Sequence, residues 1–562
     1  MNTLTKRLLW IAVCCLPFIS GCKQPNENAV SKNAISDALY RNLPFEMPKV
    51  QQPVFPAYEV NIEKFGAKGD GTTLDTRAIQ SAIDSAAVCG GETVVLPPGR
   101  YLSGTLILKN NVALHIEKGA ILLGSTSLDD YPQYVSHYVS HINRYSSRSL
   151  IFAEGVENIS ISGEGTIDGQ GSLENYPATE TETLMGITRR PYLIRVISCK
   201  GVKLSDIHLR NSPAWTQHYL DCENVFIDGI DVYNHGNYNN DGIDIDNCRQ
   251  VRIVNSHFNT DDDAICFKTT NATGRCENVV VANCVIAANC NAMKWGSETN
   301  GGFRNFTITN CTFRRAEEPT IYDRPHRTLG GLAIETVDGA LLENFNISNI
   351  SMYGVMTPIF IRLADRGRNY YDGGPSQPAG TLRNIHIANL TARMHGLVTS
   401  SITGLEKHPV ENVTLTNVHI ICDGNGSVEH ARKRDLPERE KEYPETLIFA
   451  DAPASGLFVK NVKGIRMQNV MLEVYESDPR ALLFMERVND ALLDGITLVN
   501  PSDGPQVILR NSRDIDIEKL RYDGSRVPCI GIEGTDNRRI ETDKKYSVDH
   551  SDGRNSKKNR HK

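Results

Sequence analysis

The chain has 562 residues, of which 40% are hydrophobic and 23% are charged, and its formal net charge is −7. This mildly acidic balance, without a basic patch before the C-terminal tail, argues against a nucleic-acid partner. The length alone would favour several domains, but elongated β architectures often exceed that expectation. The 44 glycines and the frequent Asn-Gly, Asp-Gly and Glu-Asn pairs indicate many tight turns.

Residues 1–21 have the pattern of an export signal. Lys6 and Arg7 precede an apolar run over residues 8–19, which is too short to span a bilayer as a mature helix. The Ile-Ser-Gly-Cys sequence that follows resembles a bacterial lipobox, and this resemblance implies cleavage before Cys22 and lipidation of its sulfur. We therefore expect a bacterial lipoprotein, periplasmic or on the cell surface, that is anchored to a membrane through Cys22. A plain secretory signal is the alternative.

Residues 22–57 are polar and rich in proline, and we expect them to be a linker between the anchor and the folded body. Small and apolar residues then recur at helical spacing over residues 76–88. A single amphipathic helix before a long β region predicts a cap on one end of the core.

Residues 58–534 form a repeat, as in ENISISGEGTIDG from Glu157, ENVFIDGIDVYNH from Glu223 and RNFTITNCTFRRA from Arg304. Each unit has a polar pair, an alternating strand, a bend at Asn, Asp or Gly, and a second alternating strand. Units about 25 residues long suit coils of three short strands, and coils stacked about 4.8 Å apart would align ladders of Asn, Ile, Val and Cys. The prediction is an all-β fold, a right-handed parallel β-helix with a short N-terminal capping helix. A leucine-rich repeat is the alternative, but its leucine spacing is missing.

The longer insertions, at 128–150, 175–188, 315–330, 364–379 and 424–453, are expected to be loops, often on the binding face. The most charged stretch, residues 432–445, either borders a substrate groove or, as we favour, is solvated.

Several of the 14 cysteines recur in repeat phrases, which favours buried free thiols over a disulfide framework or a zinc site. Residues 535–562 are polar and basic, and we expect a disordered tail.

Three aspartates within residues 239–268 are the main catalytic candidates. Asp262 follows Asp241 by 21 residues, about one coil, so Asp241 and the Asp262–Asp263 pair should project from neighbouring turns of one wall. Carboxylates in one groove repel each other, so one of them should keep its proton near neutral pH. Paired carboxylates with room for a water between them suit hydrolysis of a glycosidic bond with inversion. The alternative is Asp-rich turns that cap strands and bind solvent.

Several stretches, in order, resemble glycoside hydrolase family 28, the polygalacturonase family, which has a pectin-lyase-like β-helix. They include FGAKGDGTTLDTRAIQSAI, PPGRYLSGTLILKNNVALHIEKGAILLGS and RRPYLIRVISCKGVKLSDIHLRNSPAWTQH. Residues 239–241 (Asn-Asn-Asp) resemble the family's Asn-Thr-Asp motif, and residues 261–263 (Asp-Asp-Asp) resemble its Gly-Asp-Asp motif. The resemblance implies that Asp262 is the general acid and that Asp241 and Asp263 activate water. It also implies a pectic or related uronate-containing glycan as substrate, with no metal or organic cofactor.

Two further family motifs are altered. The register from residues 296–298 (Gly-Ser-Glu) places Asn291 at the family's histidine, and Ala333 and Glu335 stand where its arginine and lysine would bind a carboxylate. Loss of two cations should weaken binding of an acidic sugar there. Four aromatic residues could stack on sugars or be buried between coils: Trp215, Trp295, Tyr322 and Tyr370. The candidate substrate-binding residues are Asn239, Lys268, Asn291, Lys294, Glu298, Arg327 and Arg362.

The sequence thus favours a monomeric, inverting glycoside hydrolase, with exo action or a rhamnogalacturonan substrate left open. A polysaccharide lyase on the same fold is one alternative; it would need a base and usually Ca²⁺ or other cationic neutralisation of a uronate. A non-catalytic surface glycan-binding protein is the other alternative, suggested by the altered motifs.

Overall fold

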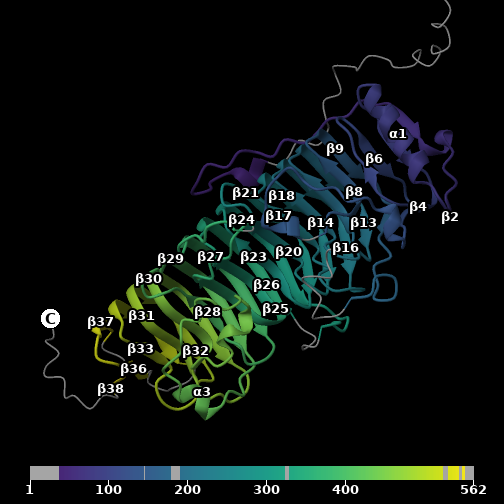
Figure 1. Ribbon diagram of the computed structural model, residues 1–562. Coiled ribbons are helices and arrows are strands. Elements are labelled where there is room, and N and C mark those ends of the chain that lie inside the picture. Colours follow the sequence, from purple (N-terminus) through teal and green to yellow (C-terminus); the bar gives the residue numbers. More distant parts are fainter. Residues whose placement is uncertain are drawn as a thin grey trace, which may run out of the picture.

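The computed structural model describes residues 37–144, 146–178, 190–322, 328–371, 373–522, 529–543 and 547–550. Within them the chain is a stack of parallel strands that runs from the N-terminal end, where α1 (Thr76–Val88) lies, to the C-terminal end (Figure 1). The predicted all-β, right-handed parallel β-helix is confirmed. No helix within these residues is long and apolar enough to cross a bilayer. The predicted signal and Cys22 lie outside the described residues.

Three ladders of parallel strands, called A, B and C in the order in which the chain passes through each coil, form the walls. Ladder A contains β5 (Leu106–Ile107), β8 (Ser149–Glu154), β11 (Tyr192–Ile197), β14 (Gln217–Leu220), β17 (Ile243–Asp246), β20 (Ile265–Thr269), β23 (Asn291–Thr299), β25 (Thr328–Thr336), β28 (Ser400–Thr403), β33 (Val507–Arg510), β36 (Cys529–Glu533) and β38 (Ser547–His550).

Ladder B contains β1 (Glu59–Asn61), β3 (Thr93–Leu96), β6 (Ala113–Ile116), β9 (Glu157–Ser162), β12 (Lys200–Ser205), β15 (Glu223–Asp228), β18 (Arg249–Val254), β21 (Arg275–Ala282), β34 (Arg513–Glu518) and β37 (Arg538–Thr542). Ladder C contains β2 (Asp70–Leu74), β4 (Gly99–Ser103), β7 (Ala120–Gly124), β10 (Thr166–Asp168), β13 (His208–Arg210), β16 (Asp231–Asn234), β19 (His257–Thr260), β22 (Val285–Ala288), β32 (Thr497–Val499) and β35 (Arg521–Tyr522).

Six long strands bend from one ladder into the next: β24 (Gly302–Arg315), β26 (Leu341–Leu363), β27 (Thr381–Met394), β29 (Val410–Cys422), β30 (Ala454–Val474) and β31 (Ala481–Asp494). The short helices are η1 (Asp37–Tyr40), η2 (Ile62–Phe65), η3 (Leu128–Asp130), η4 (His141–Arg144), α3 (Val428–Arg432) and η6 (Thr446–Phe449).

The predicted helix over residues 76–88 is confirmed as α1. Its apolar face, which includes Ile79 and Ile83, is buried in the main core, and the helix ends before Gly90 and Gly91, both at positive φ. That this helix acts as a cap stays a prediction.

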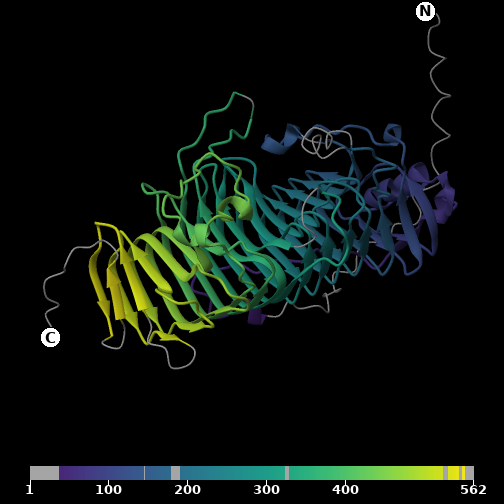
Figure 2. The same cartoon turned by 90° about the horizontal axis from the view of Figure 1, so that it is seen from below.

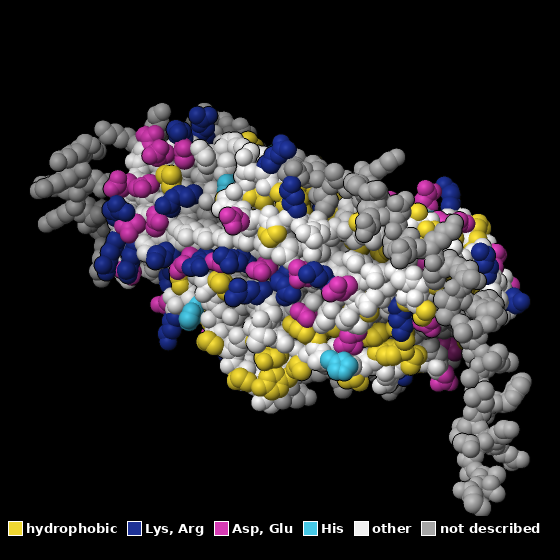
Figure 3. Space-filling view, turned by 90° about the horizontal axis from the view of Figure 1, so that it is seen from above, with side chains coloured by type: hydrophobic (Ala, Val, Ile, Leu, Met, Phe, Trp, Pro, Cys, Tyr) yellow, Lys and Arg dark blue, Asp and Glu magenta, His cyan; other side chains and the backbone are white. Residues whose placement is uncertain are grey.

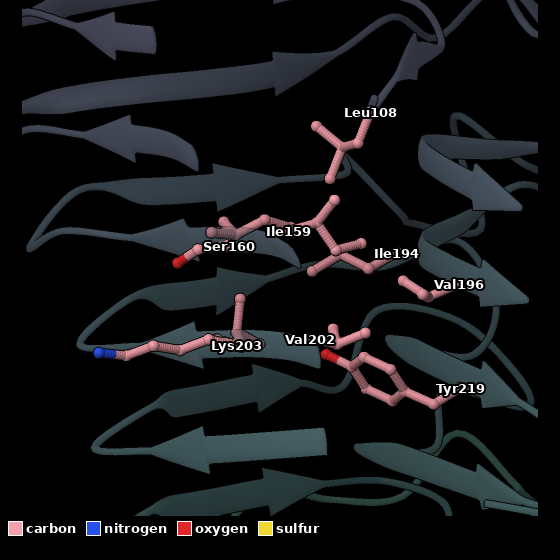
Figure 4. A pocket seen from close by; sticks show the side chains of 10 residues that line it. Leu108, Ile159, Ser160, Ile194, Val196, Val202, Lys203 and Tyr219 are labelled. Atoms are coloured by element: carbon pink, nitrogen blue, oxygen red, sulfur yellow. The ribbon is translucent and has the colours of Figure 1, made fainter. Parts of the chain in front are cut away.

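Side chains alternate between the inside and the outside of the coil, as the sequence pattern predicts. Figure 4 shows Ile159, Ile194, Val202 and Tyr219 pointing into the coil, while Lys203 points away from it. The space between these apolar side chains is a cavity of about 10 Å³, the lower limit for one water molecule. The interior is therefore a packed core and not a channel.

Asparagine ladders hold the turns of successive coils together. Asn305 and Asn344 adopt φ values of 61° and 64°, a left-handed conformation that Asn tolerates better than most residues. The Asn344 side-chain amide donates to Asn305 at 3.1 Å, and Asn384 donates to Asn344 at 3.2 Å. Each asparagine thus serves both the turn and the stack, and the predicted Asn ladder is confirmed.

From Lys200 to Lys463 the first residue of the polar pair alternates in charge from coil to coil. Opposite charges on neighbouring parallel strands attract, whereas like charges so close would destabilise the stack. A band of alternating basic and acidic side chains runs along the face seen in Figure 3. The aligned residues are Lys200, Glu223, Arg249, Glu277, Arg304, Glu343, Arg383, Glu411 and Lys463.

Nine of the described cysteines are buried free thiols, as predicted for the repeat phrases, whereas Cys89 is disulfide-bonded.

Two boundary predictions need correction. In the predicted linker, Val50 is buried and the backbone amide of Gln51 donates to Asn224, so this part packs on the solenoid. Beyond residue 534, β37 and β38 continue ladders B and A, so these two segments of the predicted disordered tail are strands.

Candidate active site

The three candidate aspartates lie where ladder C connects to ladder A. The register pairs Ile243 of β17 with Ile265 of β20, which sets Asp241 beside Asp263 one coil later. The backbone amide of Gly242 donates to the carbonyl of Asp263 at 2.9 Å and fixes this alignment. The prediction that Asp241 and the Asp262–Asp263 pair project from neighbouring turns is confirmed.

Asp263 is the aspartate that the site holds in its ionised form. Its Oδ1 accepts from the backbone and side-chain amides of Asn291, at 3.1 and 2.7 Å, and its Oδ2 lies 3.3 Å from Lys294 Nζ. Burial alone would raise the pKa of Asp263, but Lys294, Lys268 and the Asn291 amide outweigh burial and lower it.

Asp241 and Asp262 differ in exposure and in surroundings. Burial, with the like charges of Asp244 and Asp262, raises the pKa of Asp241 well above its usual value. Asp262 is only partly buried, and its carboxylate accepts from the Asp263 backbone amide at 3.0 Å and from the Tyr322 hydroxyl. One aspartate of the three thus favours its proton in the free site, as expected, and that aspartate is Asp241.

Lys268 is central to a second buried charge network. Its Nζ lies 3.4 Å from Asp244 and 3.2 Å from Glu298, and 4.8 Å from the centre of the Trp215 ring. Burial disfavours its charge, but the surrounding anionic groups outweigh burial and raise the pKa of Lys268. The pKa of Asp244 is raised to about 8, chiefly by burial. Lys268 therefore lies beneath the site and supplies positive charge to several carboxylates.

The sequence did not indicate that Asn240 and Tyr322 position Asp262. The side-chain carbonyl of Asn240 accepts from the backbone amide of Asp262 at 3.0 Å and ties one catalytic turn to the next. The Tyr322 hydroxyl, which accepts from the Asn239 backbone amide at 2.8 Å, donates to Asp262. Arg190 in turn donates to the Asn239 side chain at 3.0 Å. The sequence predicted only that Tyr322 could stack on a sugar or be buried, and it contains no signal for the bond to Asp262.

The altered motifs have distinct physical consequences. Asn291 holds Asp263, so its amide replaces the family's histidine with a group that cannot titrate. Ala333, in register with Lys294, is buried in an apolar cluster with residues of the 424–453 insertion, including Phe449. Glu335 is also buried, and burial raises its pKa well above the usual value. The strand that carries cations in the family's motif is therefore covered and uncharged here.

Cations reach the site from the 364–379 insertion instead. Arg366 is held by Asp338 and by the backbone carbonyl of Ser297, and Arg368 donates to Glu298 at 2.7 Å. Neither arginine was among the predicted site residues. Both lie in a loop insertion, which does not follow the spacing of the repeat, so the sequence does not indicate which coil they contact.

Residues 433–446, which we call the strap, run back along ladder A toward the catalytic coil. The backbone carbonyls of residues 438 and 439 accept from Arg362, and the Tyr443 ring lies over Lys294 Nζ, 5.6 Å from the ring centre. Tyr443 also lies 5.7 Å from the Arg366 guanidinium and is 54% exposed. Within residues 432–445 the charged side chains of Arg432, Asp435, Glu440, Lys441 and Glu442 are exposed, as expected for a solvated loop, while Tyr443 borders the site.

The remaining predicted residues have different positions. Arg362 is buried beneath the strap and bonds to strap carbonyls, so we reassign it from substrate binding to fastening the strap. Arg327 lies outside the described residues. Trp295 packs in the core against Phe267, and Trp215 is buried beside Lys268, so neither ring is free to stack on a sugar.

Two groups of side chains have the composition and spacing of cation ligands: Asp241, Asp244 and Cys266, and Asp262, Asp263 and Cys290. In each group a lysine amine already lies within 3.4 Å of one carboxylate. The buried lysines therefore supply the positive charge that a metal would otherwise bring.

The insertions surround ladder A. Those at 128–150, 175–188, 315–330 and 424–453 interrupt the connection from ladder C to ladder A, and the one at 364–379 follows ladder A. Figure 2 shows blue and green loops projecting from one side of the stack. This arrangement agrees with the expectation that insertions lie on the binding face.

Comparisons with known proteins agree with this architecture. The chain is 30% identical over 226 residues to a probable polygalacturonase of Vitis vinifera, and 30% identical over 252 residues to an exo-poly-alpha-D-galacturonosidase of Dickeya chrysanthemi. These matches cover 38% and 37% of this chain but only 45% and 41% of the relatives, so the chain spans less than half of their length.

Among solved structures, an exopolygalacturonase from Thermotoga maritima matches with a TM-score of 0.56 and 24% identity, over 66% of this chain and 89% of that one. A family 28 exopolygalacturonase from Yersinia enterocolitica matches with a TM-score of 0.53 and 21% identity, over 87% and 79%. These two likenesses establish the fold. The family model for glycosyl hydrolases family 28 matches residues 92–434, more than half of the sequence. The chain belongs to glycosyl hydrolases family 28.

Proposed function

We propose that this protein is an exported glycoside hydrolase that cleaves a pectic, uronate-containing glycan with inversion. The observation that carries the proposal is the grouping of Asp241, Asp262 and Asp263 on adjacent coils, with Lys294 and Asn291 holding Asp263 ionised. Hydrolysis of a glycoside needs a proton donor and a base in one groove, and this trio supplies both.

In the proposed mechanism the ionised Asp263 deprotonates the attacking water, and Asp241 helps to hold that water in place. Asp262 is the most exposed of the three and protonates the leaving oxygen. Asp241 keeps the proton in the free site, because its pKa is raised. To protonate the leaving oxygen, Asp262 must carry a proton when the glycan is bound.

We also propose exo action. From Ala333 onward, the outer face of ladder A is covered by apolar residues of the insertion, Leu436, Ile448 and Phe449. The strap therefore ends the groove at Lys294, and a polymer cannot continue along the wall past the half-exposed Tyr443 ring. At this closed end Arg366 and Tyr443 are the groups that the chain presents to the terminal sugar.

Export, the lipid anchor on Cys22 and the monomeric state belong to the same proposal. Their support is the signal-like sequence of residues 1–22 and the glycan substrate class, which lies outside the cytoplasm. Gel electrophoresis of a Cys22→Ser variant, with metabolic labelling by a fatty acid, tests the anchor. Loss of label in Cys22→Ser is the expected result.

Product profiling on polygalacturonate and rhamnogalacturonan tests the activity. We expect monosaccharide or a short terminal unit from the earliest times, absent in Asp262→Asn and unchanged in Asp206→Asn, the same substitution at an exposed turn. Proton NMR of the first product should show the inverted anomer. Products that absorb in the ultraviolet would indicate a lyase, and binding without turnover in the wild type would indicate a glycan-binding protein.

A further inference from the structure

A second pocket lies on ladder A well beyond the catalytic coil, and its cavity of about 370 Å³ is open to solvent. We call it the basic pocket. Its floor is the aligned row Lys460, Glu486 and Arg510, on β30, β31 and β33. Residues 434–437 of the strap form one side, and Arg487 with Asn511 forms the other.

The basic pocket has an excess of positive charge. Glu486, only 2% exposed, is the one buried carboxylate among three cations: Lys460 lies at 3.2 Å, Arg510 at 2.8 Å and Arg487 at 3.4 Å. One anion cannot neutralise three cations. Asp435 lies 3.7 Å from Arg510, but its side chain is 99% exposed, so solvent screens its charge.

The fourth cation, Arg434, is already neutralised. Its guanidinium makes a two-pronged contact with Glu533, at 2.5 and 2.9 Å, and this pair helps to fasten the strap. Arg487 and Arg510 are different, because both share a single carboxylate oxygen of Glu486. Their side chains are about one quarter exposed and lie at an open cavity, where a second carboxylate would reduce the excess of positive charge.

We infer that the basic pocket is an accessory site for the carboxylate of an acidic sugar residue. That the ligand is a glycan rests on the proposed function. The pocket is not a continuation of the catalytic groove, because the strap and its apolar cluster cover the wall between them. Six coil steps separate β20 from β31, or about 29 Å at the usual strand spacing.

An accessory site at that distance would hold the protein on a polymer without touching the bond that is cleaved. A second contact on the same polymer raises the effective concentration of chain ends near the catalytic aspartates. Short oligosaccharides cannot reach both places, so the site should matter for polymers only.

Equilibrium binding of polygalacturonate and trigalacturonate to the Asp262→Asn protein tests the inference, with a neutral galactan as control. Arg487→Gln should weaken polygalacturonate binding about tenfold, since it removes one charge-assisted contact. Asp435→Asn should tighten it about two- to fivefold, because it removes the exposed anion at the rim. Arg466→Gln, the same charge loss at an exposed site on ladder B, should change nothing.

The opposite signs of the two substitutions separate binding from folding. Asp435 is almost fully exposed, so Asp435→Asn leaves the fold intact, and unchanged affinity in both variants overturns the inference. Equal weakening by Arg466→Gln would also overturn it, since the effect would then be one of net charge. If the wild-type protein binds the polymer through the basic pocket but hydrolyses nothing, the proposed function fails and the accessory site stands.

Discussion

Replacement of Lys294 by methionine tests how the site keeps Asp263 ionised. Lys294 is 3% exposed and its Nζ lies 3.3 Å from Asp263, whereas methionine has similar volume and no charge. For unit charges at that separation, Coulomb's law with an effective dielectric constant of about 20 gives roughly 5 kcal/mol. Lys268 and the Asn291 amide remain and still favour the ionised form, so the pKa of Asp263 should rise by less than this full pair energy would give.

The consequence is a shift of the acidic limb of the pH–rate profile. Asp263 must be ionised to act as a base, and its pKa is lowered in the wild type, so activity is lost only as the pH falls through that low value. In Lys294→Met the limb should move to higher pH, and kcat/KM at a pH below the new limb should fall about 10- to 100-fold. Lys294→Arg keeps the charge and should keep the limb.

The assay is kcat/KM on a soluble oligogalacturonate between pH 3 and 9, taken well below the Tm of each variant. Breaking a buried ion pair costs roughly 3–5 kcal/mol of stability, so a lower Tm is expected as well. An acidic limb at the same pH in wild type and Lys294→Met would refute the assignment of Asp263 as the base that Lys294 maintains.

Three further outcomes follow from the contacts described. Tyr322→Phe removes the hydroxyl that donates to Asp262 and should lower kcat about tenfold with little change in KM; an unchanged kcat would contradict its positioning role. Tyr443→Ala should raise KM about tenfold while Tyr443→Phe stays near wild type, because the ring face is the proposed contact; equal effects of both would point to the hydroxyl. Asn344→Ala should lower the free energy of unfolding, measured with denaturant, by about 2–3 kcal/mol, since it removes two ladder hydrogen bonds and strains a positive φ. Asn344→Gly should lower it less, because glycine adopts a positive φ without strain.

The fold followed from the sequence because a solenoid repeats one local rule. Polar pairs, alternating strands and bends at Asn, Asp or Gly recur at coil length, so each repeat supports the same prediction. Boundaries were less certain: β37 beyond residue 534 continues ladder B although its segment has no apolar periodicity of its own. This strand is ordered because it pairs with the edge strand β34, and not because its own sequence has a strand pattern.

The grouping of the three candidate aspartates was predictable for a similar reason. Asp241, Asp262 and Asp263 lie within one coil length of each other, so their proximity depends only on the repeat. The distribution of charge among them was not predictable from the repeat. Lys294 lowers the pKa of Asp263 from the next coil, and burial keeps the proton on Asp241.

The sequence by itself determined the β-helix, the aspartate trio and the loss of the family's cations at Ala333 and Glu335. Only the tertiary structure decided what surrounds that position: the strap along ladder A, Arg366 from another insertion, and Arg362 buried beneath the strap. Insertions have no register with the repeat, so where they fold back along the stack depends on long-range packing and ion pairing. That packing is a property of the assembled solenoid and not of any one coil.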